Sequence, residues 1–270
     1  MARQGLLLLL LLPLLATAGP EADLAAFRAY FEQRFPNNEI NDHIDGAYAL
    51  DPEKREQWLA MEDFPPYEFA IDDGEGLFQT PFANGQGYAD CFENEGAVKH
   101  LYPQYDESRG TVVTLEMAVN DCRSANGEEP LAYDSDELAE LTAYIAFVSR
   151  DNLIDIKVPA DAEAAYAAGK QYYYSRRGQL NFACSHCHMQ MSGMKLRAET
   201  LSAGIGQVTH WPAYRFKWQE VGALHRRFVR CNEQVGAEGL PYQSEPYRNL
   251  EYFLTFMSNG MPINGPASRK

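Results

Sequence analysis

The chain has 270 residues, of which 46% are hydrophobic and 23% are charged, and its formal net charge is −15. This composition is typical of a globular protein with a packed core and excludes a disordered or fibrous chain. The acidic balance argues against nucleic acid as a partner, because nucleic-acid binding requires a basic face.

Residues 1–18 have the pattern of an export signal. Arg3 precedes the apolar run 6–12, and the small residues 16–18 form a cleavage site. The run is too short to span a bilayer comfortably, and no other stretch is long and apolar enough. We expect a mature exported protein that begins at Gly19 and has no membrane span. An uncleaved anchor is the alternative.

Three later segments have the pattern of helices. Residues 135–149 and 244–258 place their apolar side chains on one face, and Ser135 has the residue type of an N-cap. Residues 161–174 are rich in alanine and follow a proline. The pattern predicts a mainly α-helical fold with two small domains, joined near residues 150–158.

The segment 183–188 contains the motif C-x-x-C-H, formed by Cys184, Cys187 and His188. This motif attaches c-type haem: two thiols bond to the vinyl groups, and the following imidazole ligates the iron. A redox pair or a zinc site is the weaker interpretation, because a zinc site would need further Cys or His ligands at a second motif. We therefore expect one covalently bound haem c, with His188 as the proximal ligand.

The sixth ligand of the iron is open at this point. Met257 and Met261 are far enough along the chain, although Met257 lies in a helical pattern typical of the core. The other candidates are His210, His225 and Cys231.

The chain contains an internal repeat, in which Cys122 of the first copy matches Cys231 of the second. Between positions 122 and 149, nine of 28 positions are identical to those of the second copy. The matched pairs are Cys122/Cys231, Gly127/Gly236, Glu129/Glu238, Leu131/Leu240, Tyr133/Tyr242, Ser135/Ser244, Leu141/Leu250, Phe147/Phe256 and Ser149/Ser258. The chain therefore predicts two related domains, 45–150 and 151–262.

The first copy has a degenerate haem motif at residues 91–96. Cys91 and Gly96 are kept, whereas Asn94 replaces the second cysteine and Glu95 replaces the histidine. Without the histidine there is no proximal ligand, so we expect the first domain to lack haem. Cys91 and Cys122 would then form a disulfide in an oxidising compartment. Two buried free thiols are the alternative.

Cys231 is then the unpaired cysteine, and the repeat places it where Cys122 once faced the first haem. This predicts Cys231 as the distal iron ligand. Three arginines precede it, and Arg227 would share a helical face with Cys231. In the first copy Ala118 takes the place of Arg227. We interpret Arg227 as functional, and Arg226 and Arg230 as partners of haem propionates or surface carboxylates.

These residues resemble the SoxA family, the A subunits of the SoxAX cytochromes of bacterial thiosulfate oxidation. The resemblance covers about residues 25–262 and rests on CSHCH, HRRFVRCN and the degenerate CFENEG motif. Among members of this family, the chain is similar to those with one haem. It implies two tandem cytochrome c-like domains and an L-cysteine S-thiosulfotransferase activity.

The resemblance also implies partners and residue roles. Thiosulfate would be joined to a cysteine of the SoxYZ carrier protein. Two electrons would leave through haem to a soluble cytochrome c, and a small one-haem subunit, SoxX, would complete a heterodimer. Cys231 would ligate the iron as a persulfide intermediate, Arg227 would bind the substrate, and His188 would be the proximal ligand. The alternative function is a plain electron-transfer cytochrome c with His/Met ligation.

Overall fold

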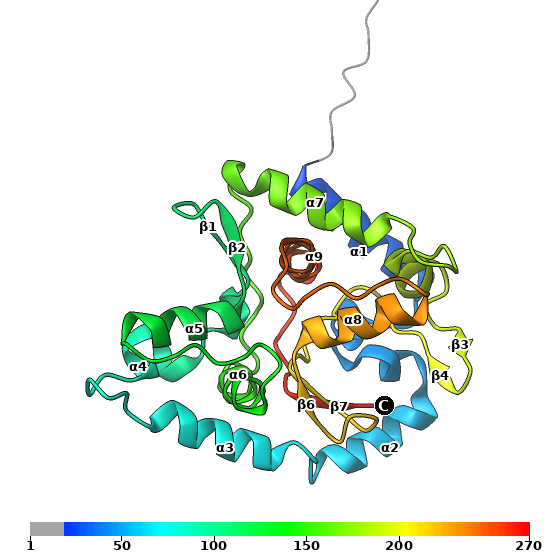
Figure 1. Ribbon diagram of the computed structural model, residues 1–270. Helices are drawn as coiled ribbons and strands as arrows, with labels where there is room; N and C mark the ends of the chain where they lie inside the picture. The colour runs from blue at the N-terminus through cyan, green and yellow to red at the C-terminus, as the bar shows by residue number, and fades with distance from the viewer. Residues whose placement is uncertain (1–18) are drawn as a thin grey trace, which may run out of the picture.

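The computed structural model describes residues 19–270, and the predicted export signal lies outside them. About half of this range is helical, which confirms the mainly α-helical fold class (Figure 1). No helix in the range is long and apolar enough to cross a membrane. The main helices are α1 (Pro20–Arg34), α2 (Pro52–Glu62), α3 (Glu68–Gln79), α4 (Tyr88–Cys91), α5 (Leu115–Ala125), α6 (Asp136–Val148), α7 (Glu163–Tyr174), α8 (Leu224–Gln234) and α9 (Glu245–Phe256).

Helices α6, α7 and α9 agree closely with the three helices predicted from the sequence. The Ser135 hydroxyl accepts a bond from the backbone N–H of Leu138 at 3.3 Å, so Ser135 is the N-cap of α6. The strands are short: β1 (Gln104–Asp106), β2 (Thr111–Val113), β3 (Lys195–Leu196), β4 (Glu199–Thr200), β5 (Ala213–Arg215), β6 (Glu220–Gly222) and β7 (Ala267–Arg269).

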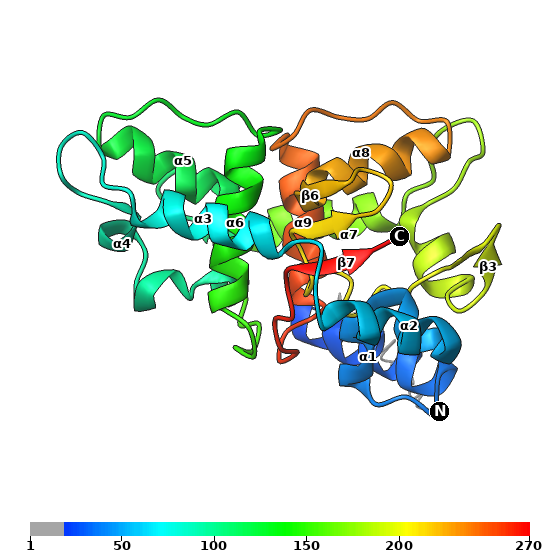
Figure 2. The same cartoon turned by 90° about the horizontal axis from the view of Figure 1, so that it is seen from below.

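The internal repeat is visible in the structure. The hairpin β1–β2 recurs as β5–β6, and α5 recurs as α8, both at the offset that relates Cys122 to Cys231. The starts of α6 and α9 are related by the same offset. Both hairpins are antiparallel, and β7 adds to β5 in parallel. Figure 2 shows the two copies side by side, with α3–α6 in one half and α7–α9 in the other, which confirms the prediction of two related copies.

Each copy is built on a close helix crossing that only glycine permits. A Cβ atom on Gly74 in α3 would lie 2.1 Å from the carbonyl oxygen of Glu140 in α6. A Cβ on Gly169 in α7 would lie 1.9 Å from the carbonyl oxygen of Asn249 in α9. Glu140 and Asn249 are themselves matched by the repeat, so both copies use the same contact.

The two copies have separate buried clusters of unequal size. The first copy packs Phe78, Phe82, Tyr88 and Phe92 around α5 and α6. The second copy packs α7 and α9 and also recruits Phe27 and Phe31 of α1, far away in sequence. The 3₁₀ segment η1 (Ile40–Leu50) and α2 likewise contact the second copy, through β4 and β7 respectively.

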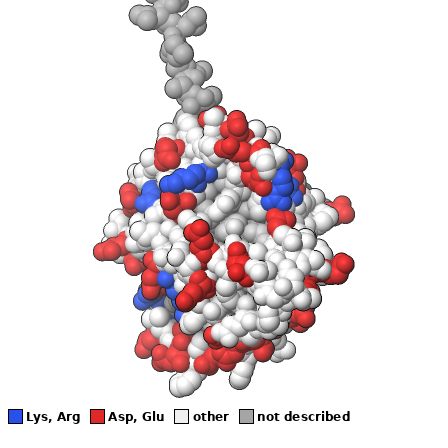
Figure 3. Space-filling view, turned by 90° about the vertical axis from the view of Figure 1, so that its left-hand side faces the viewer, with Lys and Arg blue, Asp and Glu red and all other residues white. Residues whose placement is uncertain are grey.

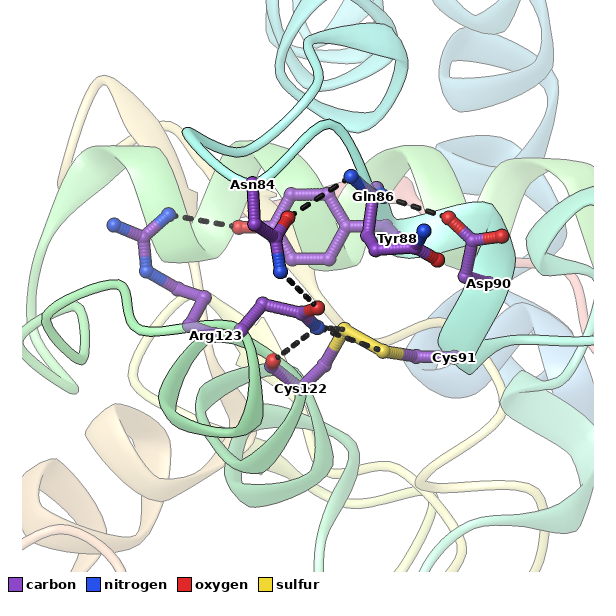
Figure 4. Close-up of a disulfide and its surroundings, with 9 residues drawn as sticks. Asn84, Gln86, Tyr88, Asp90, Cys91, Cys122 and Arg123 are labelled. Atoms are coloured by element: carbon purple, nitrogen blue, oxygen red, sulfur yellow. Dashed lines mark hydrogen bonds between the residues drawn. A yellow bond between two sulfur atoms is a disulfide. The ribbon is translucent and has the colours of Figure 1, made fainter.

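Cys91 of α4 and Cys122 of α5 form a disulfide, as predicted (Figure 4). The side-chain amide of Asn126 lies 3.8 and 3.9 Å from the two sulfur atoms, and Arg123 donates to the Tyr88 hydroxyl at 3.0 Å. Glu95, which replaces the haem-ligating histidine, is exposed. The first copy therefore has a tethered aromatic core where the second has its attachment motif.

We expect Gly74→Ala to destabilise the fold by about 1–3 kcal/mol, because the added methyl overlaps the α6 backbone. Gly76→Ala is the matched control: it lies in the same helix, and a Cβ there meets no atom within 4 Å. The control should be stabilising by roughly 0.5–1 kcal/mol, because glycine is unfavourable inside helices. Urea unfolding measures both, and equal effects would contradict the close crossing.

Candidate functional site

The attachment motif closely follows α7. Arg177 and Phe182 form a bridge across the turn after α7, and residues 186–190 form one π-helical turn. The Nδ1 atom of His186 accepts a bond from the backbone N–H of Ala183 at 3.0 Å, so His186 closes the start of this turn. Cys184 and Cys187 are half-buried and are not bonded to one another. Both thiols are therefore available for attachment.

His188 is oriented as an iron ligand. Its Nδ1 atom lies 3.2 Å from both the carbonyl oxygen and the hydroxyl of Ser202. With the proton on Nδ1, it donates to that carbonyl and leaves the lone pair on Nε2 free for a metal. The amide nitrogen of Gln207 lies 3.2 Å from Nε2. Burial, and to a smaller extent the charge of Arg227, lowers the pKa of His188 to about 4. The imidazole is therefore neutral near pH 7, the form that binds metals.

Cys231 and Arg227 lie on α8, so the helical face that they would share does form. Burial raises the pKa of Cys187, with Cys231 adding to the rise and Arg227 opposing it. Burial raises the pKa of Cys184 to about 11. The charge of Arg177 lowers this pKa, whereas that of Cys231 raises it further. The Coulomb interaction between two charged groups weakens as their separation increases. The structure therefore brings Cys231 and Arg227 together with the attachment motif, although they are far from it in sequence.

The competing candidates for the sixth ligand are engaged elsewhere. Met257 is 1% exposed and packs in the core of the second copy. Met261 is 0% exposed and belongs to the same buried cluster. His225 has both ring nitrogens facing protein atoms. His210 is 6% exposed, and its ring packs against that of Trp211 with the ring centres 5.7 Å apart.

The three arginines that precede Cys231 differ in their partners, in the way that the sequence suggests. Arg226 pairs with Glu220 at 2.5 Å and Arg230 pairs with Glu233 at 2.7 Å, so both have surface carboxylate partners. Within residues 19–270, Arg227 pairs with no carboxylate. Its guanidinium is therefore available to bind an anion bidentately.

Arg215 is a site residue that the sequence pattern alone did not single out. It lies on β5, and its Nε atom is buried without a hydrogen-bond partner in the part of the chain that the structure describes. Burial and the charge of Arg227 lower its pKa to about 10, while Cys231 acts in the opposite direction. The first copy has Asp106 at the matching position, so the charge is reversed between the copies. This reversal of charge between the copies is the sequence signal that could have identified Arg215.

The residues of the second copy fit a c-type haem. Two unpaired thiols and an oriented imidazole belong to one short segment, and a third unpaired thiol approaches from α8. We therefore expect one covalent haem per chain, measured by intact mass and by the pyridine haemochrome spectrum.

The double variant Cys184→Ala/Cys187→Ala should lose this covalent haem, because both attachment bonds are removed. Cys231→Ala is the control and should keep it. Two haems per chain, or covalent haem in the double variant, would refute the assignment.

Comparisons with known proteins agree with this geometry. A family model described as the SoxA/TsdA cytochrome c domain matches residues 73–154 and 168–263. The chain is 56% identical over 256 residues to the L-cysteine S-thiosulfotransferase subunit SoxA of Allochromatium vinosum, covering 94% of this chain and 91% of that protein. It is 52% identical to the SoxA of Chlorobaculum thiosulfatiphilum, covering 93% and 88%.

A crystal structure of SoxXA from P. pantotrophus is similar to this chain, with a TM-score of 0.73 and 28% identity. The match covers 80% of this chain and 84% of that one. The duplicated cytochrome c-like fold, the attachment motif and the position of Cys231 beside it thus agree with a single interpretation: the chain belongs to the SoxA family.

Proposed function

We propose that this chain is the A subunit of an L-cysteine S-thiosulfotransferase and conjugates thiosulfate to a cysteine of a SoxYZ carrier protein. The observation that carries the proposal is that Cys231 and Arg227, four residues apart on α8, both lie near the attachment motif, where each affects Cys187 and Arg227 also affects His188. A plain electron carrier does not require a free guanidinium at the iron ligand. The relatives that cover nearly the whole chain are named for this transferase activity.

A haem c is the cofactor of this family, and here we propose one, held covalently by Cys184 and Cys187. His188 would bind the iron through Nε2, and Cys231 would be the second protein ligand. When bound, the haem supplies an acceptor for electrons. Ser202 keeps His188 in the ligating tautomer, which is the usual role of a residue behind a metal ligand.

In the proposed conversion, a sulfur–sulfur bond forms between the outer sulfur of thiosulfate and the carrier cysteine. The carrier thiol loses one proton, two electrons leave, and the product is a cysteine S-thiosulfonate. Arg227 would bind the sulfonate oxygens of thiosulfate and orient the outer sulfur toward Cys231. We further propose that Cys231 carries an extra sulfur, as a persulfide. Its thiolate would take the outer sulfur of a thiosulfate, and sulfite would leave.

The proposed partners are a small haem c subunit of the SoxX type, the SoxYZ carrier and a soluble cytochrome c that accepts the electrons. The similar crystal structure is one of SoxXA, a name that pairs SoxA with SoxX. Asp and Glu outnumber Lys and Arg on the face of α4, α5 and β1 (Figure 3). With a net charge of −15, this surface favours partners with basic faces. We propose the periplasm as the location.

Replacement of Cys231 by Met or Ala should abolish conjugation while covalent haem remains, because the variant keeps both thioether bonds and His188. The wild type should show the electron spin resonance spectrum of His/thiolate ligation. Full activity in either variant, or a wild-type His/Met spectrum, would favour the plain electron carrier instead.

Replacement of Arg227 by Ala should lower kcat/KM for thiosulfate by about 10²–10³, the usual loss when one preorganised charged donor is removed. Arg226→Ala is the matched control, because Arg226 is the adjacent residue of α8 and pairs with Glu220. The control should stay within about twofold of wild type, as exposed ion pairs contribute little. Equal losses in both variants would contradict a binding role for Arg227.

A further inference from the structure

The helix that carries Arg227 and Cys231 has two unlike faces. Its buried face consists of Leu224, His225, Phe228 and Asn232, and this face contacts α9. The ring of Phe228 lies 5.5 Å from that of Tyr247, and Asn232 donates to the Tyr247 hydroxyl at 2.7 Å. Because α-helices turn about 100° per residue, Arg227 and Cys231 share a second face to one side of the buried one. The rotation of α8 about its axis therefore determines where these two side chains lie.

Helix α8 lacks both tethers that hold its counterpart α5. In α5 the Thr114 hydroxyl caps the backbone N–H of Met117 at 3.3 Å, and Cys122 is fixed by the disulfide. In α8 the residue that matches Thr114 is Ala223, which provides no side-chain cap, and Cys231 forms no disulfide. Some other contact must fix the first turn of α8.

That contact is a chain of buried polar groups that runs through His225. The Thr114 hydroxyl of the first copy donates to the side-chain oxygen of Gln243 at 2.8 Å. The backbone N–H of Gln243 donates to Nδ1 of His225 at 3.0 Å. The other ring nitrogen, Nε2, lies 3.1 Å from Oε2 of Glu251 in α9. Oε1 of Glu251 lies 3.8 Å from the ammonium of Lys99, again in the first copy.

The three ionisable side chains of this polar chain are all buried. Lys99 is 7% exposed, and His225 and Glu251 are each 2% exposed. Because Nδ1 accepts the bond from Gln243, a neutral His225 carries its proton on Nε2, facing the carboxylate. Lys99 is then the positive partner that keeps Glu251 ionised in the interior, where an unpaired charge would be strongly unfavourable.

The backbone at Gln243 supports the same conclusion. Gln243 has a φ of 57°, in the left-handed region that is unfavourable for residues other than glycine. Strain of this kind persists only where the surrounding structure holds it, and it concentrates near functional sites. Here the strained residue is the one whose N–H binds His225.

We propose that this polar chain is a positioning device. Through Thr114 and Lys99, the first copy fixes the rotation of α8 and so holds Arg227 and Cys231 at the haem. The inference rests on the proposed function, because it assigns a purpose to that site's supporting residues. It also gives the first copy a role in the reaction even though that copy lacks the haem-attaching residues.

The test uses the full chain with its haem, and it compares His225→Leu with His225→Gln. The leucine removes the hydrogen bond from Gln243 and the close approach to Glu251, whereas the glutamine amide keeps a donor that can face Glu251. His225→Leu should keep covalent haem, alter the spin resonance spectrum of the Cys231 ligation and lower kcat by about 10- to 100-fold, the usual effect of slight misplacement. KM should change little, and His225→Gln should restore most of kcat and the spectrum.

A second variant tests the contribution of the first copy. Lys99→Met combined with Glu251→Gln removes both charges and leaves no unpaired buried ion, so the fold is retained. It should shift the spectrum and kcat in the same direction as His225→Leu. The control is Glu116→Gln, because Glu116 matches His225 in the first copy and is also buried, at 5% exposed. The control should leave the spectrum unchanged.

Wild-type spectrum and kcat in both His225→Leu and the double variant would overturn the inference. So would an equal spectral change in Glu116→Gln, which would indicate a general loss of packing. Failure of the proposed function is recognised separately, because Cys231→Ala would then remain active in the same assay.

Discussion

The close crossing of α7 and α9 at Gly169 is the contact on which the candidate site depends. Helix α7 leads into the attachment motif, and α9 supplies Glu251 and Tyr247, which hold α8. Because a Cβ on Gly169 would overlap the α9 backbone, the two helices can be this close only with glycine there. The proposed haem ligands, His188 and Cys231, are thus both positioned by this one pair of helices.

Much of this arrangement could be predicted from the sequence. The motif around Cys184 and the helix 136–148 have local patterns, and the internal repeat relates Cys231 to Cys122 without knowledge of the fold. The hairpins were not predicted, because strands of three residues are too short for a periodic pattern. Helix α1 was missed because its two buried residues, Phe27 and Phe31, make a weak apolar stripe.

The polar chain through His225 could not be predicted from the sequence, for a different reason. Its members come from separate segments of the chain, and Lys99 and Glu251 have no counterpart of the same type in the other copy. A repeat reveals what two copies share, whereas this contact crosses from one copy to the other. Once the structure is known, the repeat shows where the two copies differ: Thr114 and Cys122 tether α5, whereas Ala223 and Cys231 do not tether α8.

Helix α1 has a consequence for how the chain folds. The rings of Phe27 and Phe253 lie 6.5 Å apart, so the beginning of the described chain packs against nearly its end. Contacts between residues so distant in sequence close late, because the chain between them must first be ordered. The core around α9 is therefore incomplete until the whole chain has been synthesised. A truncated chain that lacks α1 would leave the buried face of Phe253 and Tyr173 exposed to solvent and prone to association with other copies.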